Sequence, residues 1–287
     1  MIAPREQRVA LLHGAMNAQV WGDDNAPSLI ALHGWLDNAG SFAFLAPLLA
    51  MRFRVVALEL PGHGGSDHLP PGADYHYMDY VQAVLHAVDA LSLDRYVLLG
   101  HSLGAGVASL VAAAQPERIE RLLLIEGLGP LGDDGSLTLQ RFRDALAPRG
   151  GGAKPLRLFR SIEQAIGVRS MVSGLPAELA RPIVERGLIE AGGGWRWRSD
   201  PRLTRPSATR LAESQVHALL RGIAAPTALL LAQPATPYLP SAPMQARADC
   251  VARIVVSHLD GGHHLHLQHP TAVHAWIESS LRDSDRA

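Results

Sequence analysis

The stretch YVLLGHSLGAG, residues 96–106, decides the fold. A run of apolar residues typical of a buried strand leads into G-H-S-L-G at residues 100–104, and a helical pattern of small residues follows. In the pattern G-x-S-x-G a strand turns sharply into a helix, so the central serine stands on a tight, strained turn with its hydroxyl exposed. Glycine on both sides leaves room for the turn, because a Cβ would crowd it. The stretch therefore predicts that Ser102 is a nucleophile.

The residues on both sides of this stretch alternate between strand patterns and helical patterns. Such alternation indicates a parallel sheet with helices on both faces, and the continuous apolar runs agree, because central parallel strands are buried on both sides. The first two strands are short enough to form an opening antiparallel pair. The predicted strands cover residues 8–14, 17–22, 29–35, 53–60, 96–102, 121–127, 226–232 and 250–259, and the predicted helices cover 77–91, 103–115 and 271–281.

The regular alternation breaks between residues 131 and 222. This segment has no pattern of a buried parallel strand, but it has helical stretches such as LPAELARPIVERGLIEA at 175–191. An insertion between two strands of the sheet is the simplest account, so we expect a core domain made of residues 1–130 and 223–287 and a cap domain made of residues 131–222. The cap has more Lys and Arg than Asp and Glu, which favours either a solvated surface or a lid for anionic or polar substrates.

The composition excludes several classes of protein. The chain has 287 residues, of which 47% are hydrophobic and 18% charged, as in a globular protein. Its net charge of −1 gives no general attraction to nucleic acid or to an anionic membrane. Cys250 is the single cysteine, so no internal disulfide is possible and a reducing compartment is expected. No signal-peptide pattern and no apolar run of about 18 residues occurs, so we expect a cytoplasmic protein with no membrane insertion and a small-molecule substrate as its partner.

A group of histidines lies in the stretch LDGGHHLHLQHP near the C-terminus. A serine hydroxyl is a weak nucleophile and needs a base, and that base needs an acid to orient it. A histidine in the loop after the last predicted strand can supply that base, and the Gly-His that follows VVSHLD predicts His263, with His264 as the alternative. The spacing of His263, His264, His266 and His269 matches no zinc motif, so no metal site is expected.

A second strand end carries HGWLDNAGSF at residues 33–42. Acyl transfer builds negative charge on the carbonyl oxygen, and two backbone N–H groups aimed at that oxygen form an oxyanion hole. The amides that follow the two turns belong to Trp35 and Leu103, so we predict that they form this hole. We expect His33, Gly34 and His101 to lie at the substrate pocket.

These segments together resemble the α/β-hydrolase superfamily, and within it they are most similar to the serine hydrolase-like proteins. The resemblance covers about residues 8–130 and 223–282 and includes no part of the predicted cap. It implies an eight-stranded, mostly parallel sheet with helices on both faces and a mainly helical cap inserted after the sixth strand. The resemblance rests on HGWLDNAGSF, LPGHGGSD, GHSLGAG, LIEGLGP and GGHHLHLQHP.

The sequence departs from this superfamily at the catalytic acid. The resemblance would place an aspartate after the seventh strand, near Thr236, but QPATPYLP has no carboxylate. Some haloalkane dehalogenases carry the acid at the end of the sixth strand, and that resemblance points to Glu126. A carboxylate at the end of an apolar run is costly to bury unless it is paired, and His263 would pair it. The alternatives are Asp260 or Asp37 as the acid, with Glu126 capping a loop or pairing with an arginine.

The serine at the elbow also selects the chemistry. In this superfamily the opening of haloalkanes and epoxides uses an aspartate at the elbow, so Ser102 favours attack on a carbonyl. We predict a serine hydrolase that cleaves a carboxylic ester, thioester or lactone of a small molecule through an acyl-enzyme, with no cofactor. One alternative is a scaffold that binds a small ligand with slow turnover or none, and its support is the vacant seventh-strand position. Another is a cofactor-free perhydrolase.

Overall fold

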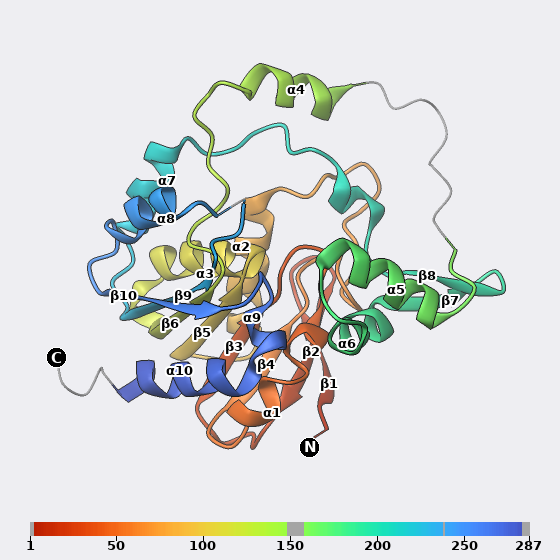
Figure 1. The fold of residues 1–287 in the computed structure, drawn as a ribbon, viewed down its shortest axis with the longest axis horizontal. Helices are drawn as coiled ribbons and strands as arrows, with labels where there is room; N and C mark the ends of the chain where they lie inside the picture. Colours follow the sequence, from red (N-terminus) through yellow and green to blue (C-terminus); the bar gives the residue numbers. More distant parts are fainter. Residues whose placement is uncertain (1–2, 148–157, 238, 283–287) are drawn as a thin grey trace.

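The centre of the protein is an eight-stranded sheet with the strand order β1-β2-β4-β3-β5-β6-β9-β10 (Figure 1). The computed structural model describes residues 3–147, 158–237 and 239–282. β2 is antiparallel to β1 and β4, and the remaining neighbours are parallel, so the predicted fold class is confirmed. The strands are β1 Arg5–Ala10, β2 Ala15–Trp21, β3 Ser28–Leu32, β4 Arg54–Leu58, β5 Tyr96–His101, β6 Ile119–Ile125, β9 Thr227–Gln233 and β10 Ile254–Asp260.

Alternate residues of the central strands point into two hydrophobic cores, one on each face of the sheet. In β3, Ile30 and Leu32 pack into one core and Leu29 and Ala31 into the other. Side chains from α2, α3, α7 and α8 complete the first core, and side chains from α1, α9 and α10 complete the second. The helices are α1 Ala46–Leu49, α2 Tyr77–Ala90, α3 Leu103–Ala114, α7 Glu213–Leu220, α8 Ser241–Ala248, α9 Leu265–Gln268 and α10 Pro270–Arg282, with 3-10 turns η1 Ala39–Phe42 and η2 Pro116–Arg118.

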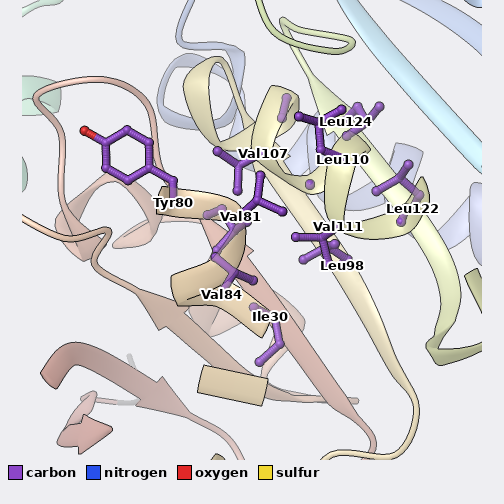
Figure 2. Close-up of a cluster of buried hydrophobic side chains, with 14 of the residues drawn as sticks. Ile30, Tyr80, Val81, Val84, Leu98, Val107, Leu110, Val111, Leu122 and Leu124 are labelled. Atoms are coloured by element: carbon purple, nitrogen blue, oxygen red, sulfur yellow. The ribbon is translucent and has the colours of Figure 1, made fainter. Parts of the chain in front are cut away.

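The helical spacing of apolar residues in α2 explains how it joins the first core. Val81 and Val84 lie one turn apart and face the sheet beside Val107 and Val111 of α3 (Figure 2). The inner positions of α3 are mostly alanine and glycine, so its backbone can lie close to the strands that it follows. The serine at the start of α3 is therefore fixed by a helix that is itself packed into the centre of the molecule.

The segment between β6 and β9 is mainly helical, as the family resemblance implied. The predicted helix at 175–191 is wrong at its end, because the helix stops at Gly187 and residues 188–191 form a strand. Gly192 and Gly193 have φ of 57° and 78°, which allows a tight turn that pairs this strand with the next one. The elements are α4 Thr138–Leu146, α5 Ile162–Ser173, α6 Ala177–Gly187, β7 Leu188–Ala191, β8 Gly194–Trp197 and η3 Pro201–Thr204.

A small third core lies within this segment. Trp195 and Trp197 share one face of β8 and pack against Phe159, Ile166 and Val184, with the rings of Phe159 and Trp197 in edge contact at 5.4 Å. The hairpin β7–β8 therefore packs against α5 and α6, and the two tryptophans have a structural role.

Helix α6 is bound to the core by polar contacts. Asn38 donates a hydrogen bond of 2.8 Å to the carbonyl of Ile183. Gly40 lies so close to α6 that a Cβ there would come within 2.4 Å of the carbonyl oxygen of Pro182. Helix α7 also packs on the core, although it falls within the predicted cap range, and the boundaries at 130, 131, 222 and 223 remain a prediction.

In the part of the chain that the structure describes, no helix combines the length and the apolar character needed to cross a membrane.

Candidate active site

The carboxyl end of β5 carries Ser102 on a strained turn into α3. Ser102 has φ of 53° and ψ of −115°, a backbone conformation that few side-chain-bearing residues adopt. A Cβ on Gly100 would lie 2.5 Å from the carbonyl oxygen of Gly104, and a Cβ on Gly104 would lie 2.1 Å from that of Leu32. Only glycine fits at either place, so the residues around Ser102 are those that a sharp strand-to-helix turn requires.

Glu126 lies at the carboxyl end of the neighbouring strand, β6. Its backbone also has a positive φ, 54°, and its carboxylate is buried. The amide of Ala232 donates a hydrogen bond of 2.5 Å to Oε1, and the hydroxyl of Thr236 donates one of 3.1 Å to Oε2. These donors stabilise the ionised carboxylate in a place where burial alone would disfavour it.

His263 lies in the loop after β10, and its Nδ1 is 3.0 Å from Oε2 of Glu126. An ionised carboxylate can only accept, so the proton of the neutral ring lies on Nδ1. Nε2 then keeps the lone pair that a general base needs. The structure thus brings Glu126 and His263 together at the edge of the sheet where β5 presents Ser102.

The other candidate acids lie in different surroundings. Asp260 is exposed at the end of β10. Asp37 is buried, but its Oδ1 accepts a hydrogen bond from Arg169 of α5. His264, the alternative base, is buried with its Nε2 3.7 Å from Oδ2 of Asp37.

His263 belongs to a cluster of four histidine rings in which His101 contacts the other three. The ring centroids of His101 lie 4.8 Å from His263, 5.2 Å from His264 and 4.3 Å from His266. His101 Nε2 donates a hydrogen bond of 2.8 Å to the carbonyl of His263, and Ser41 bonds Nε2 of His266 at 2.7 Å. Within the described residues, no three or more His, Cys, Asp or Glu side chains are grouped as metal ligands.

Burial keeps the rings of His101, His264 and His266 neutral. It lowers the pKa of His264 to about 4 and the pKa of His101 and His266 well below the ordinary histidine value. The neighbouring histidines lower the pKa of His101 further, because a second positive charge in the cluster would repel the first.

The loop after β3 is braced by the side chain of His33, which is fully buried. Its Nε2 accepts a hydrogen bond of 3.0 Å from the amide of Leu60, so Nδ1 carries the proton and donates to the carbonyl of Gly34 at 2.7 Å. Burial also lowers the pKa of this histidine. The ring therefore links the β3 and β4 ends and fixes the loop that precedes Trp35.

The two predicted oxyanion-hole amides belong to Trp35, in this loop, and to Leu103, the first residue of α3. Neither amide donates a hydrogen bond within the described ranges, and an amide in the first turn of a helix has no acceptor inside that helix. Trp35 is 52% exposed, and its Nε1 donates a hydrogen bond of 3.2 Å to the carbonyl of Leu203. Trp35 thus lies at the surface of the site.

The structure places the residues expected at the substrate pocket inside the wall of the site. His33 and His101 are buried, and a Cβ on Gly34 would lie 2.9 Å from Nδ1 of His101. Gly34 is required because His101 packs against it. Whether these residues also contact substrate remains a prediction.

Some residues around the site have no motif in the sequence. Glu59 is fully buried and is bound by Arg186 of α6 through contacts of 2.6 and 3.1 Å. Like Glu126, it is a carboxylate at the end of an apolar strand, and that signal was available in the sequence. Arg169 and Arg186 lie on helices with no recognisable motif, so their contacts with the core became evident only in the fold.

Comparisons with known proteins agree with the fold. The family model described as alpha/beta hydrolase fold matches residues 27–181. A serine hydrolase-like protein of Dictyostelium discoideum is 30% identical over 89% of this chain and 75% of its own length. The crystal structure of a hypothetical protein from Pseudomonas aeruginosa PAO1 is 38% identical with a TM-score of 0.86, covering 97% of this chain and 98% of its own. A thioesterase domain from the curacin biosynthetic pathway is 25% identical with a TM-score of 0.81, covering 96% of this chain and 99% of its own. The chain belongs to the α/β-hydrolase fold family and is homologous to serine hydrolase-like proteins.

Proposed function

We propose that the protein is a serine hydrolase that cleaves a carboxylic ester, thioester or lactone of a small molecule through an acyl-enzyme. The observation that carries this proposal is the 3.0 Å contact between Glu126 and His263 at the sheet edge that also presents Ser102. A nucleophile, a base and an acid on three neighbouring parts of one edge are the groups that acyl transfer requires.

In the first step the hydroxyl of Ser102 attacks the carbonyl carbon of the substrate, and its proton moves to Nε2 of His263. Glu126 accepts the hydrogen bond from Nδ1 and stabilises the imidazolium that forms. The amides of Trp35 and Leu103 donate to the oxyanion. His263 then gives its proton to the leaving group, and the acyl group remains on Ser102.

In the second step water attacks the acyl-enzyme. His263 takes a proton from the water, the same two amides hold the second oxyanion, and the proton passes to Ser102 as the acid product leaves. Each proton transfer uses a group of this chain.

Two observations support acyl transfer to a serine. The elbow carries a serine, whose hydroxyl forms an ester with an acyl group. A solved structure similar to this chain is a thioesterase domain, and thioester cleavage is acyl transfer of the same kind. The vacant position after β9 was the support for a non-catalytic scaffold, and Thr236 at that position donates to the carboxylate of Glu126.

In this proposal residues 131–222 form a cap that selects the acyl group. The segment that follows β6 arches away from the sheet through α4 (Figure 1). Leu139, Phe142 and Leu146 share one face of α4 at the spacing of helical turns and are 48–62% exposed.

A fluorophosphonate probe tests the proposal directly, because it labels only an activated serine. The wild-type protein should be labelled and should hydrolyse p-nitrophenyl acetate, whereas Ser102→Ala should do neither. A wild-type protein that is folded but neither labelled nor active would refute the proposal and favour a ligand-binding scaffold.

A further inference from the structure

Asp37 is a buried carboxylate beneath the candidate active site. Its side chain is 1% exposed, and its amide donates a hydrogen bond of 3.1 Å to the carbonyl of Gly34, so it belongs to the loop of the predicted oxyanion hole. Oδ1 accepts a hydrogen bond from Arg169, which reaches in from α5 of the insertion. Oδ2 accepts from the hydroxyl of Ser41 at 3.4 Å.

Two histidines face Oδ2 of Asp37. Nε2 of His264 lies at 3.7 Å and Nδ1 of His101 at 4.0 Å, and this Nδ1 has no hydrogen-bond partner within the described residues. Gly34 completes the contact, since a Cβ there would come within 3.2 Å of Oδ2. These groups form a packed cluster in which Arg169 supplies the positive charge that balances Asp37.

The same two histidines flank His263. His101 donates to its carbonyl, and the ring of His264 lies 5.3 Å from its ring, centroid to centroid. Asp37 is therefore separated from His263 by a single residue, which is His101 on one side and His264 on the other. Arg169 lies one contact further out, on an element that belongs to the insertion and not to the sheet.

We propose that Arg169, which lies in the insertion, is a positioning residue for His263. It balances the charge of Asp37, so that His101 and His264 stay neutral where they pack against the catalytic ring. The proposal rests on the proposed role of His263 as the general base.

The charges around Asp37 determine the effect of removing Arg169. The charged and titratable groups that face Asp37 are Arg169 of α5, His101 of β5 and the loop residue His264. His263 and His266 pack against His101, and Glu126 lies beyond His263. A buried carboxylate without a counter-ion recruits a proton. Burial lowers the pKa of His264 most, Asp37 raises it, and His263 and Arg169 lower it, so the loss of Arg169 should raise this pKa and favour a proton on the ring.

That proton would be a positive charge beside His263. It opposes the imidazolium that forms during catalysis, so kcat of Arg169→Met should fall by about tenfold, which corresponds to one pKa unit. KM should change by less than about twofold, because Arg169 has no proposed contact with substrate. The pH profile of kcat should gain a second ionisation.

The test follows the histidine rings by NMR in protein carrying isotope-labelled histidine, as the pH is varied. In Arg169→Met the ring of His264 should titrate at a higher pH than in wild type. Arg169→Lys, which keeps the charge, should titrate as wild type does. The double variant Arg169→Met with Asp37→Asn, which removes both charges, should titrate at a lower pH than Arg169→Met, because Asp37 raises the pKa of His264.

Arg186→Met is the matched control, because it makes the same substitution in another ion pair between the insertion and a buried carboxylate of the core, Glu59. It should leave the His264 titration unchanged. The inference would be overturned if His264 titrated in Arg169→Met as it does in wild type. It would also be overturned if His264 titrated in the double variant as it does in Arg169→Met. Labelling by the fluorophosphonate distinguishes the two proposals. If the wild-type protein is not labelled, the proposed function is refuted. If the wild-type protein is labelled and its pH profile of kcat is the same as that of Arg169→Met, only the role of Arg169 is refuted.

Discussion

The hydroxyl of Thr236 donates a hydrogen bond of 3.1 Å to Oε2 of Glu126, the same oxygen that lies 3.0 Å from Nδ1 of His263. Thr236 occupies the place after β9 where the resemblance to the α/β-hydrolase superfamily led us to expect an aspartate. Here the end of β9 supplies hydrogen-bond donors, from Thr236 and from the amide of Ala232, and the end of β6 supplies the charge. The carboxylate of Glu126 is thus carried by the end of β6 and held in position by hydrogen bonds from the end of β9.

Glu126→Gln should lower kcat for p-nitrophenyl acetate by about 10³- to 10⁴-fold, because an amide no longer selects the tautomer with the proton on Nδ1 or stabilises the imidazolium. The measurement is steady-state kinetics at a fixed pH, with circular dichroism to confirm folding. Asp260→Asn is the control, since Asp260 is exposed. Equal rates in Glu126→Gln and wild type would assign the acid to another carboxylate.

Thr236→Val should remove a hydrogen bond to a charged group, which contributes about 1.5–3 kcal/mol. The carboxylate keeps its contacts with Ala232 and His263, so we expect kcat to fall about tenfold and not to vanish. Thr236→Ser keeps the hydroxyl and should retain most of the activity. If valine and serine give the same kcat, the hydroxyl plays no part in orienting Glu126.

Gly104→Ala should lower the free energy of unfolding by about 3 kcal/mol or more, because the new methyl group would meet the carbonyl of Leu32 at 2.1 Å. Gly167→Ala is the matched change on α5, where Gly167 is exposed and a Cβ meets no atom within 4 Å. This second change should stabilise the protein by about 0.5–1 kcal/mol, because alanine favours a helix. Urea unfolding measures both, and a Gly104→Ala protein as stable as wild type would contradict the close packing of the turn at Ser102.

His63 should make the stability of the protein depend on pH. The ring is fully buried, with its centroid 5.0 Å from that of His33 and 6.1 Å from that of Tyr80, and burial lowers its pKa from 6.5 to about 3. In the unfolded chain the ring takes up a proton below about pH 6.5, whereas in the folded protein it stays neutral until about pH 3. The contribution of His63 to the free energy of unfolding is therefore complete above pH 6.5. It is lost as the pH falls from 6.5 toward 3, by about 1.4 kcal/mol per pH unit.

The variant His63→Asn checks this dependence, since the asparagine amide does not titrate and can donate to the carbonyl of Pro61 as Nδ1 does. Urea unfolding at pH 7.0, 6.0 and 5.0 should give a shallower loss of stability in the variant than in wild type. Parallel curves for the two proteins would show that His63 binds its proton equally in both states.

Much of the fold could be predicted from the sequence because its signals are local. The strands around Ser102 are short apolar runs, the glycines beside it are required by the turn, and the helix after it has no residue that would stop it before Gln115. His263 could be named because it follows the last apolar strand, and Glu126 because it follows the sixth strand, where the resemblance to some haloalkane dehalogenases places the acid. Their contact depends on the order of strands in the sheet, which the family resemblance supplied.

The insertion could not be predicted to the same degree, because its structure depends on contacts between distant residues. The helix expected through residue 191 ends at Gly187, since Leu188 pairs instead with Trp197. Arg169 and Asp37 are 132 residues apart, and neither position shows its partner in the sequence. A buried ion pair of this kind leaves neither a periodic pattern nor a motif in the sequence.

The ties of α6 to the core limit how this protein can be recombined with its relatives. Arg186 bridges Glu59 and Glu6, and Asn38 reaches the carbonyl of Ile183, so the insertion completes the charge balance of the domain that carries it. A chimaera that exchanges residues 131–222 alone would leave Glu59 and Asp37 as solitary buried anions. A graft of this segment therefore keeps the charge balance only when it carries arginines at positions 169 and 186, or when Asp37 and Glu59 are replaced with it.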